Sequence, residues 1–191
     1  MFLCRLYVII TWVMIMKEIK QRKAPRLQGF DYNSVGAYFI TICTLNRRCI
    51  LSRIVGTGVP DCPKIELTKY GKIADKYINQ LNSFYEHLSV ESYVIMPNHI
   101  HILLFVKENS KLTENGQSRT PVPTNVERAS SSFAQFVSTF KRFCNKEYGE
   151  NIWQARSNDH IIRGREDYEK HIKYICENPM LWYYDELYAE E

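Results

Sequence analysis

Two histidines separated by one residue, His99 and His101, lie in the stretch YVIMPNHIHILLFV at residues 93–106. The stretch is apolar on both sides of Pro97-Asn98, which indicates two strands joined by a turn. Alternate side chains of a strand share a face, so both imidazoles are expected to point the same way. A lone buried histidine is more often a hydrogen-bonded core residue, but two on one face can bind a single metal ion. The pair supplies only two ligands, and a third must come from elsewhere.

A candidate third ligand and a candidate nucleophile lie in EDYEKHIKYICENP, towards the C-terminus. Tyr174 and Asn178 are four residues apart, so they would stack on one face of a helix. If that face packs against the histidine strand, the Asn178 carbonyl oxygen could bind the metal and the phenol would lie one turn away. A divalent cation would help a phenol, whose reference pKa is about 10, to attack an electrophile. The chain has 13 tyrosines, and on spacing alone Tyr168 or Tyr183 would serve almost as well, or Tyr174 could simply be a packing residue.

The elements that must position these residues follow from hydrophobic periodicity. The segment GAYFITICT at 36–44 is typical of a buried strand, and further strands are expected at about 90–96, 99–107 and 160–163. Amphipathic helices are expected at about 68–84, 131–148 and 166–177, with Pro179 ending the last one. This order predicts an α+β, ferredoxin-like layered domain, in which helices pack on a central antiparallel sheet.

Charge is distributed unevenly along the 191 residues, of which 45% are hydrophobic and 24% charged. Such a composition is ordinary for a globular domain with a real core. The net charge is only +4, but between Met16 and Arg53 eight basic residues stand against two acidic ones. This local excess suits a polyanion such as nucleic acid, although a solvated surface explains the charge equally well.

The six cysteines form no C-x-x-C pair, which argues against a zinc ribbon or a disulfide scaffold and favours a reducing cytoplasm. Residues 1–15 are apolar but too short for a comfortable membrane span, and they lack a signal-peptide cleavage site. We interpret them as a mis-assigned or disordered leader, with translation beginning at Met14 or Met16. Residues 16–191 are expected to form a single catalytic domain, interrupted by a flexible loop at 108–126.

Several sequence blocks occur in a characteristic order between about Lys20 and Tyr188. They are YFITICT, ELTKYGKIADKYI, VIMPNHIHILL, STFKR, IWQARSNDHIIR and DYEKHIKYICENPMLW. In these blocks the chain resembles the single-tyrosine transposases of the HUH class and insertion-sequence-200 type, above all the REP-associated tyrosine transposases. The resemblance implies the HUH endonuclease fold. The chain departs from the pattern at Ser157-Asn158, where relatives often have an aromatic pair.

The resemblance also implies roles for four residues. His99 and His101 would bind a divalent metal, Mg²⁺ or Mn²⁺, with Asn178 as third ligand, and Tyr174 would be the nucleophile. The implied reaction is strand cleavage of single-stranded DNA, in which the tyrosine attacks phosphorus and forms a 5′-phosphotyrosine link. Attack by another 3′-OH would rejoin strands, giving DNA transposition or dissemination of repeats. Family members recognise hairpins with single-stranded flanks, so the expected partner is REP-like hairpin DNA.

Contacts to that DNA are expected from basic side chains in the N-terminal segment and the second helix, although any basic residue is more often solvated. They are Arg22, Lys23, Arg26, Lys141 and Arg142. Relatives in mobile elements usually form dimers and the single-gene relatives look more monomeric, so a homodimer stays open. The expected location is the bacterial cytoplasm, at the nucleoid. Two other classes stay open: a repeat-hairpin binding protein that does not cut, and a metal phosphodiesterase that uses water and does not need Tyr174.

Overall fold

The computed structural model describes residues 30, 32, 34–56, 63–107 and 131–189. The predicted leader at 1–15, the predicted loop at 108–126, and Arg22, Lys23 and Arg26 lie outside these residues.

A four-stranded antiparallel sheet forms the centre of the fold, in the order β4-β5-β1-β6. Its strands are β1 (Gly36–Cys43), β4 (Leu88–Ile95), β5 (His99–Val106) and β6 (Asn158–Ile161). Strands β1 and β5 pair over their full length, which places Cys43 opposite His99. A separate two-stranded ribbon is made by β2 (Ser52–Val55) and β3 (Lys64–Leu67). The histidine strand therefore lies inside the central sheet, between two neighbours.

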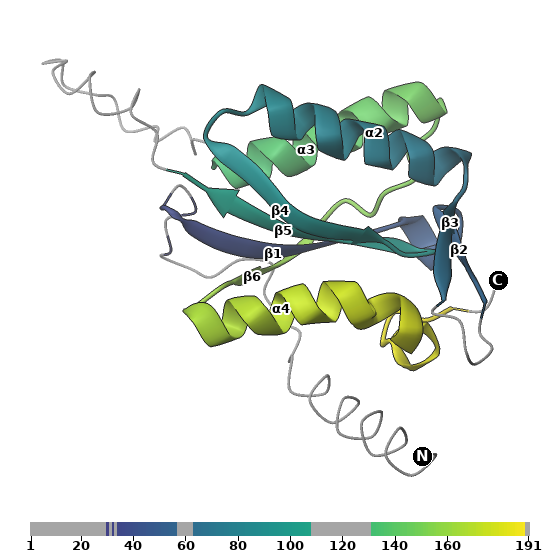
Figure 1. Ribbon diagram of the computed structural model, residues 1–191. Helices are drawn as coiled ribbons and strands as arrows, with labels where there is room; N and C mark the ends of the chain where they lie inside the picture. The colour runs from purple at the N-terminus through teal and green to yellow at the C-terminus, as the bar shows by residue number, and fades with distance from the viewer. Residues whose placement is uncertain (1–29, 31, 33, 57–62, 108–130, 190–191) are drawn as a thin grey trace, which may run out of the picture.

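Helices cover both faces of this sheet, as Figure 1 shows. Helices α2 (Lys69–Phe84) and α3 (Ser132–Tyr148) lie on one face, and α4 (Arg165–Glu177) lies on the other. The side chains of Thr68 and Ser131 cap the N-termini of α2 and α3. The predicted α+β architecture, with helices packed on a central antiparallel sheet, is confirmed. Among the described residues, no helix is both long and apolar enough to cross a membrane.

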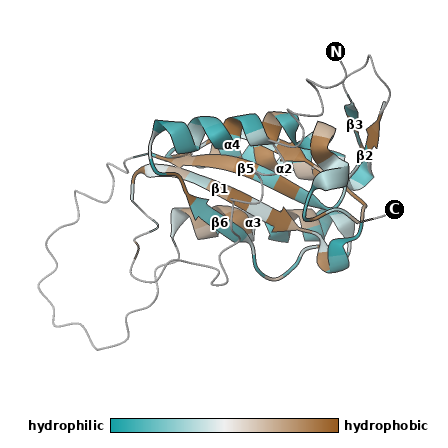
Figure 2. Ribbon diagram, turned by 90° about the horizontal axis from the view of Figure 1, so that it is seen from below, coloured by the Kyte–Doolittle hydropathy of each residue, from teal (hydrophilic) through white to brown (hydrophobic). Residues whose placement is uncertain are grey.

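Two apolar clusters, one on each face of the sheet, explain why its central strands are apolar throughout. On β1, Tyr38 and Ile40 point towards α2 and α3, whereas Phe39 points towards α4. Figure 2 shows the result as largely brown strands beneath α4, which is itself mostly hydrophilic with a few apolar residues. The face covered by α4 also carries both histidines, whereas the face covered by α2 and α3 holds the larger apolar cluster.

The prediction that Pro179 ends the last helix was incomplete. Helix α4 stops at Glu177, but the chain continues in a 3-10 helix, η3 (Asn178–Tyr184), with Pro179 in its first turn. A proline is tolerated there because its missing N–H would have no partner within the helix anyway. The extra turns matter because they place the Trp182 ring beside His99 and lead into Asp185.

Gly71 shows how closely α2 packs against the segment that precedes β2. A Cβ atom at this position would overlap the main-chain carbonyl of Leu51, which cannot move as a side-chain end can. We expect Gly71→Ala to lower the free energy of unfolding by about 3 kcal/mol, the upper end for overpacked cores. Urea denaturation of the two proteins measures this difference. Gly36→Ala is the matched control, because its Cβ would meet nothing within 4 Å, and an equal loss in both variants would contradict the prediction.

Candidate metal and nucleophile site

His99 and His101 begin strand β5, and both side chains are almost fully buried. A tight turn, closed by a bond from the Met96 N–H to the His99 carbonyl at 2.9 Å, delivers them to the central sheet. Their ring centroids are 4.5 Å apart, with the ring planes inclined by 66°. The two imidazoles thus lie side by side under α4, as strand alternation leads one to expect.

Hydrogen bonds on the far side of each ring orient the two imidazoles. His99 Nδ1 lies 2.8 Å from the side-chain oxygen of Asn98, whose amide nitrogen donates to the Leu187 carbonyl. An amide oxygen only accepts, so Nδ1 of His99 carries the proton and Nε2 keeps its lone pair. His101 Nδ1 lies 2.9 Å from the Thr41 hydroxyl, which can accept in the same way. The Asn98 amide therefore fixes the His99 tautomer that metal binding needs, and the Thr41 hydroxyl is compatible with the same tautomer of His101.

Tyr174 comes from the last full turn of α4 and reaches the histidine pair. Its hydroxyl lies 3.1 Å from Nε2 of His101 and 3.3 Å from a carboxylate oxygen of Asp185. Burial, followed by the Asp185 charge, raises the pKa of Tyr174 above its usual value. The phenol is therefore protonated at neutral pH and donates a hydrogen bond within the site.

Asp185 is a residue of the candidate site that the sequence analysis missed. It follows η3 and is 8% exposed, with one carboxylate oxygen accepting from the Leu187 N–H at 2.7 Å. Its other oxygen accepts from the side-chain amide of Asn178 at 2.9 Å. The structure brings Asn178 to the site as expected, but its amide nitrogen bonds Asp185 and its oxygen has no partner among the described residues. A buried carboxylate next to the predicted ligand was not foreseen.

Both imidazoles are held neutral. Burial, and then the positive charge of Arg47, lowers the pKa of His99 to about 3. Burial and the neighbouring His99 lower the pKa of His101 well below its usual value. Neutral imidazoles keep a lone pair for a metal, which is the protonation state that metal binding requires.

The donor set fits a divalent metal ion. One ligand atom each from His99, His101 and Asp185 lie within 4.8 Å of one another. Nε2 of His99 and the side-chain oxygen of Asn178 are buried without hydrogen-bond partners among the described residues. Unpaired buried lone pairs are costly, and a cation would satisfy them. Imidazole nitrogens together with carboxylate and amide oxygens form a donor set of the kind that divalent metal ions bind in proteins.

A second group of His160, Asp167 and His171 anchors the other end of α4. Asp167 accepts from the Arg163 N–H at 2.8 Å and lies 2.9 Å from Nε2 of His160. The rings of His160 and His171 are stacked, 4.8 Å apart and inclined by only 19°. The lone pairs of parallel rings lie in separate planes, so the two rings do not converge on one ion. The group holds α4 on the sheet. The Phe39 ring lies between this group and the candidate site, with its centroid 4.6 Å from that of His171 and 4.9 Å from that of His101.

The two described basic residues that were predicted to contact DNA lie on α3, in the layer opposite α4 (Figure 1). The Lys141 ammonium donates to three consecutive main-chain carbonyls, at residues 154–156. Burial lowers its pKa to about 8. The Arg142 guanidinium lies over the Phe143 ring, 5.2 Å from its centroid. DNA contact by these two residues stays a prediction, and Lys141 already holds a loop.

Comparisons with known proteins place the chain in a family. No family model matches it. It is 28% identical over 182 residues to an uncharacterized protein of Haemophilus influenzae, covering 90% of this chain and 96% of that one. It is 32% identical over 160 residues to a protein of the same organism named "Putative REP-associated tyrosine transposase", covering 78% of this chain and 73% of that one. A solved structure of a REP-associated tyrosine transposase bound to a REP hairpin matches with a TM-score of 0.53 and 22% identity, over 84% and 73% of the two chains; this likeness shows the fold.

The layered antiparallel fold and these relatives define a transposase, an enzyme that acts on DNA. The chain belongs to the REP-associated tyrosine transposases.

Proposed function

We propose that Tyr174 is the nucleophile with which this transposase cuts and rejoins single-stranded DNA beside repeat hairpins. The observation that supports this most directly is the place of the phenol, 3.1 Å from a histidine of the candidate metal site. A buried packing tyrosine needs only one hydrogen-bond acceptor at its hydroxyl, whereas this phenol lies beside both an imidazole and a carboxylate. A nucleophile needs such groups, because its proton must leave as the new bond forms.

In the cleavage step, the Tyr174 oxygen attacks phosphorus and loses its proton to the site or to water. The bond from phosphorus to the 3′ oxygen breaks, and that oxygen takes up a proton to become a free 3′-OH. The product is a 5′-phosphotyrosine. Attack on this link by a 3′-OH reverses the step and releases the phenol, so no external energy source is needed.

The residues that would hold the metal are His99, His101 and Asp185, with the Asn178 side-chain oxygen next to them. A bound Mg²⁺ or Mn²⁺ would act as a Lewis acid on the scissile phosphate. The site's own residues supply the nucleophile, orient the imidazoles through Asn98 and Thr41, and keep bulk water away by burial.

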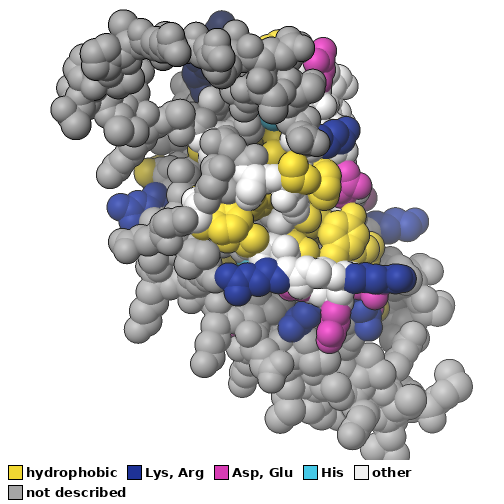
Figure 3. Space-filling model, turned by 90° about the vertical axis from the view of Figure 1, so that its left-hand side faces the viewer, with side chains coloured by type: hydrophobic (Ala, Val, Ile, Leu, Met, Phe, Trp, Pro, Cys, Tyr) yellow, Lys and Arg dark blue, Asp and Glu magenta, His cyan; other side chains and the backbone are white. Residues whose placement is uncertain are grey.

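Hairpin DNA is the proposed substrate, because a structural neighbour is described with a REP hairpin bound. A pocket between the sheet and the start of α4 offers suitable groups for an unpaired flank. It is lined by the aromatic rings of Phe105 and Tyr168 and by the basic side chains of Lys107 and Arg165. Figure 3, which views this end of the sheet, shows apolar side chains with Lys and Arg beside them. Aromatic rings stack on bases and basic groups contact phosphates.

Two competing functions make different predictions. A hairpin-binding protein that does not cut has no need for a tyrosine at a metal site, and a phosphodiesterase that uses water would leave no covalent product.

We further propose that residues 16–191 act as one catalytic domain at the bacterial nucleoid in the cytoplasm. Whether the working form is a homodimer is a separate question, which analytical ultracentrifugation with and without hairpin DNA answers.

The test uses a labelled hairpin oligonucleotide with single-stranded flanks, incubated with the protein and Mn²⁺. We expect a denaturation-resistant protein–DNA band, which disappears when EDTA removes the metal. Peptide mapping of the adduct should locate the nucleotide on the α4 peptide that contains Tyr174. Cleavage without any covalent band would favour the phosphodiesterase, and binding without cleavage would favour the silent binder.

A further inference from the structure

The short turn η1 (Leu45–Arg47), which follows β1, has an unusual backbone. Asn46 and Arg47 have φ angles of 56° and 54°, and among the described residues they alone have positive φ without being glycine. Asparagine adopts left-handed backbone readily, but for arginine this backbone is strained, and it persists where the surroundings impose it, often at functional sites. A turn that only connected two strands would not require this backbone, so a further role is expected for it.

The surroundings that impose this backbone belong to the candidate site. The N–H of Thr44, which precedes the turn, donates to the Asn98 carbonyl at 2.9 Å, and its buried hydroxyl donates to the same oxygen. Asn98 is the residue that orients His99. The Arg47 N–H closes the turn on the Thr44 carbonyl at 3.1 Å. The position of Arg47 is thus fixed relative to the metal-binding histidines by a short chain of hydrogen bonds.

The Arg47 side chain points to the other wall of the same site. One guanidinium nitrogen donates to the Glu186 carbonyl at 3.2 Å, and Glu186 directly follows Asp185. The side chain is exposed, and no carboxylate of the described residues lies within ion-pair distance of it. Its neighbour Arg48 instead pairs with Glu150 at 3.6 Å. A guanidinium has five N–H donors, so Arg47 keeps donors for a ligand.

The charge of Arg47 acts on the site. Its guanidinium donates to the carbonyl of the residue that follows Asp185, a candidate metal ligand. Before DNA binds, the positive charge of Arg47 would repel a metal ion bound at the neighbouring site. The arrangement becomes favourable when an anion lies between the two, as a phosphate held by a metal and an arginine would.

We propose that Arg47 is a catalytic residue that binds a non-bridging oxygen of the scissile phosphate. The proposal rests on the proposed function, because it assigns a further group to the same reaction. As Tyr174 attacks, charge accumulates on the phosphoryl oxygens, and a guanidinium already in place stabilises it without reorganisation. The planar fork of arginine, unlike the point charge of lysine, presents N–H donors in fixed directions, so one can bind the phosphate oxygen while another keeps its bond to Glu186.

The test compares Arg47→Ala, Arg47→Lys and Arg48→Ala in single-turnover cleavage of a hairpin oligonucleotide. Loss of one charge-stabilising donor at a reaction centre costs about 10²–10³ in rate, and we expect Arg47→Ala to lose this much. Arg47→Lys should recover only part of it. Arg48→Ala should stay within about 3-fold of wild type, as expected for loss of an exposed ion pair. Hairpin affinity in a Tyr174→Phe background should change far less than the rate.

Mn²⁺ titration followed by electron paramagnetic resonance separates a catalytic role from a structural one. Removing a positive charge near the site should leave Mn²⁺ binding by Arg47→Ala as tight as wild type or tighter. A disturbed turn would weaken it. The proposal is overturned if Arg47→Ala cuts at the wild-type rate, if Arg48→Ala loses as much, or if the lost rate comes with weakened Mn²⁺ binding. If instead Tyr174→Phe cuts DNA normally, it is the proposed nucleophile that fails.

Discussion

Replacing Tyr174 by phenylalanine is expected to abolish the covalent protein–DNA adduct and to lower strand cleavage by at least about 10⁴-fold, since nothing then replaces the nucleophile. The change removes one oxygen atom from a half-buried ring that packs on Phe39, so the fold and hairpin affinity should be retained. Denaturing gel electrophoresis of labelled hairpin with wild type and variant measures both adduct and cleavage.

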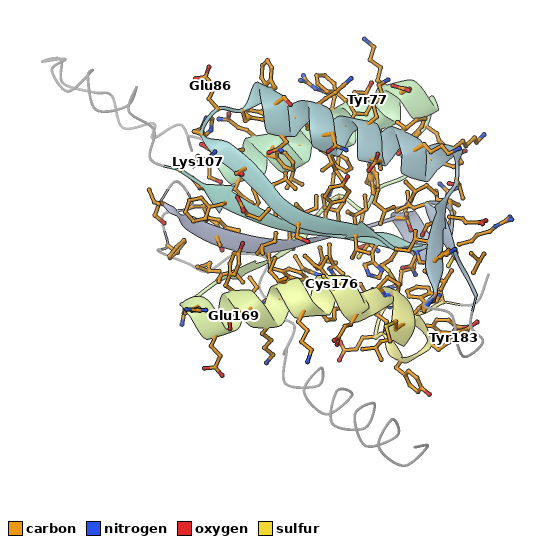
Figure 4. All side chains as sticks on the ribbon, in the orientation of Figure 1. Tyr77, Glu86, Lys107, Glu169, Cys176 and Tyr183 are labelled. Atoms are coloured by element: carbon orange, nitrogen blue, oxygen red, sulfur yellow. The ribbon has the colours of Figure 1, made fainter. Side chains whose placement is uncertain are left out.

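The matched control is Tyr183→Phe, a second tyrosine close to the same site. Its side chain is 61% exposed on η3 and projects away from the molecule in Figure 4. This variant should form the adduct at the wild-type rate. Equal cleavage by wild type and Tyr174→Phe would rule out the tyrosine mechanism, and loss of cleavage in both variants would point to general damage at the C-terminal end of the site.

Asp185→Ala should weaken Mn²⁺ binding by at least the roughly 10–100-fold that loss of an outer partner of a metal site costs. The carboxylate provides a charged oxygen beside two neutral imidazoles, and it also holds the Asn178 amide in place. Isothermal calorimetry with Mn²⁺ measures the change directly, without DNA. Cleavage should fall in parallel and recover in part at high Mn²⁺ concentration.

Two further variants make the Asp185 result specific. Asn178→Ala removes a neutral ligand and should weaken Mn²⁺ binding less than Asp185→Ala does, because a neutral oxygen attracts a cation less strongly than a carboxylate. Glu169→Gln removes a carboxylate from the outer face of α4, where Glu169 pairs with Arg165 (Figure 4), and should leave Mn²⁺ affinity unchanged. If Asn178→Ala is the more damaging of the first two, the amide is the principal third ligand, and Asp185 only positions it.

Local sequence patterns predicted most of the architecture. The β-branched and aromatic run at 36–44 and the apolar halves of 93–106 indicated strands because such residues suit a sheet covered on both faces. Helix ends were predictable from chemistry, with Thr68 and Ser131 at N-termini and Gly149, in a left-handed conformation, ending α3. The register that places Cys43 opposite His99 was beyond the same reasoning, since it depends on contacts far apart in the chain.

The candidate site was predictable only where its residues are neighbours in sequence. His99 and His101 share a strand face, and Tyr174 and Asn178 share a helix face, so fixed periodicities related each pair. Asp185 lies seven residues beyond Asn178, at the end of a 3-10 helix that the sequence analysis did not predict. Its side chain reaches the site only because the chain turns after Tyr184, and no periodic pattern encodes such a turn.

Residues 185–187, which form one wall of the candidate site, determine when the site can form during synthesis of the chain. The Leu187 carbonyl holds Asn98, which orients His99, and the Leu187 N–H holds the Asp185 carboxylate. A chain emerging from the ribosome presents both histidines early and the tyrosine much later, but it cannot close the site before Leu187 has been made and folded back. Formation of the site therefore depends on residues up to Leu187, and we expect a truncated product that keeps His99, His101 and Tyr174 but ends before Asp185 to lack the hydrogen bonds that hold Asn98 and Asn178.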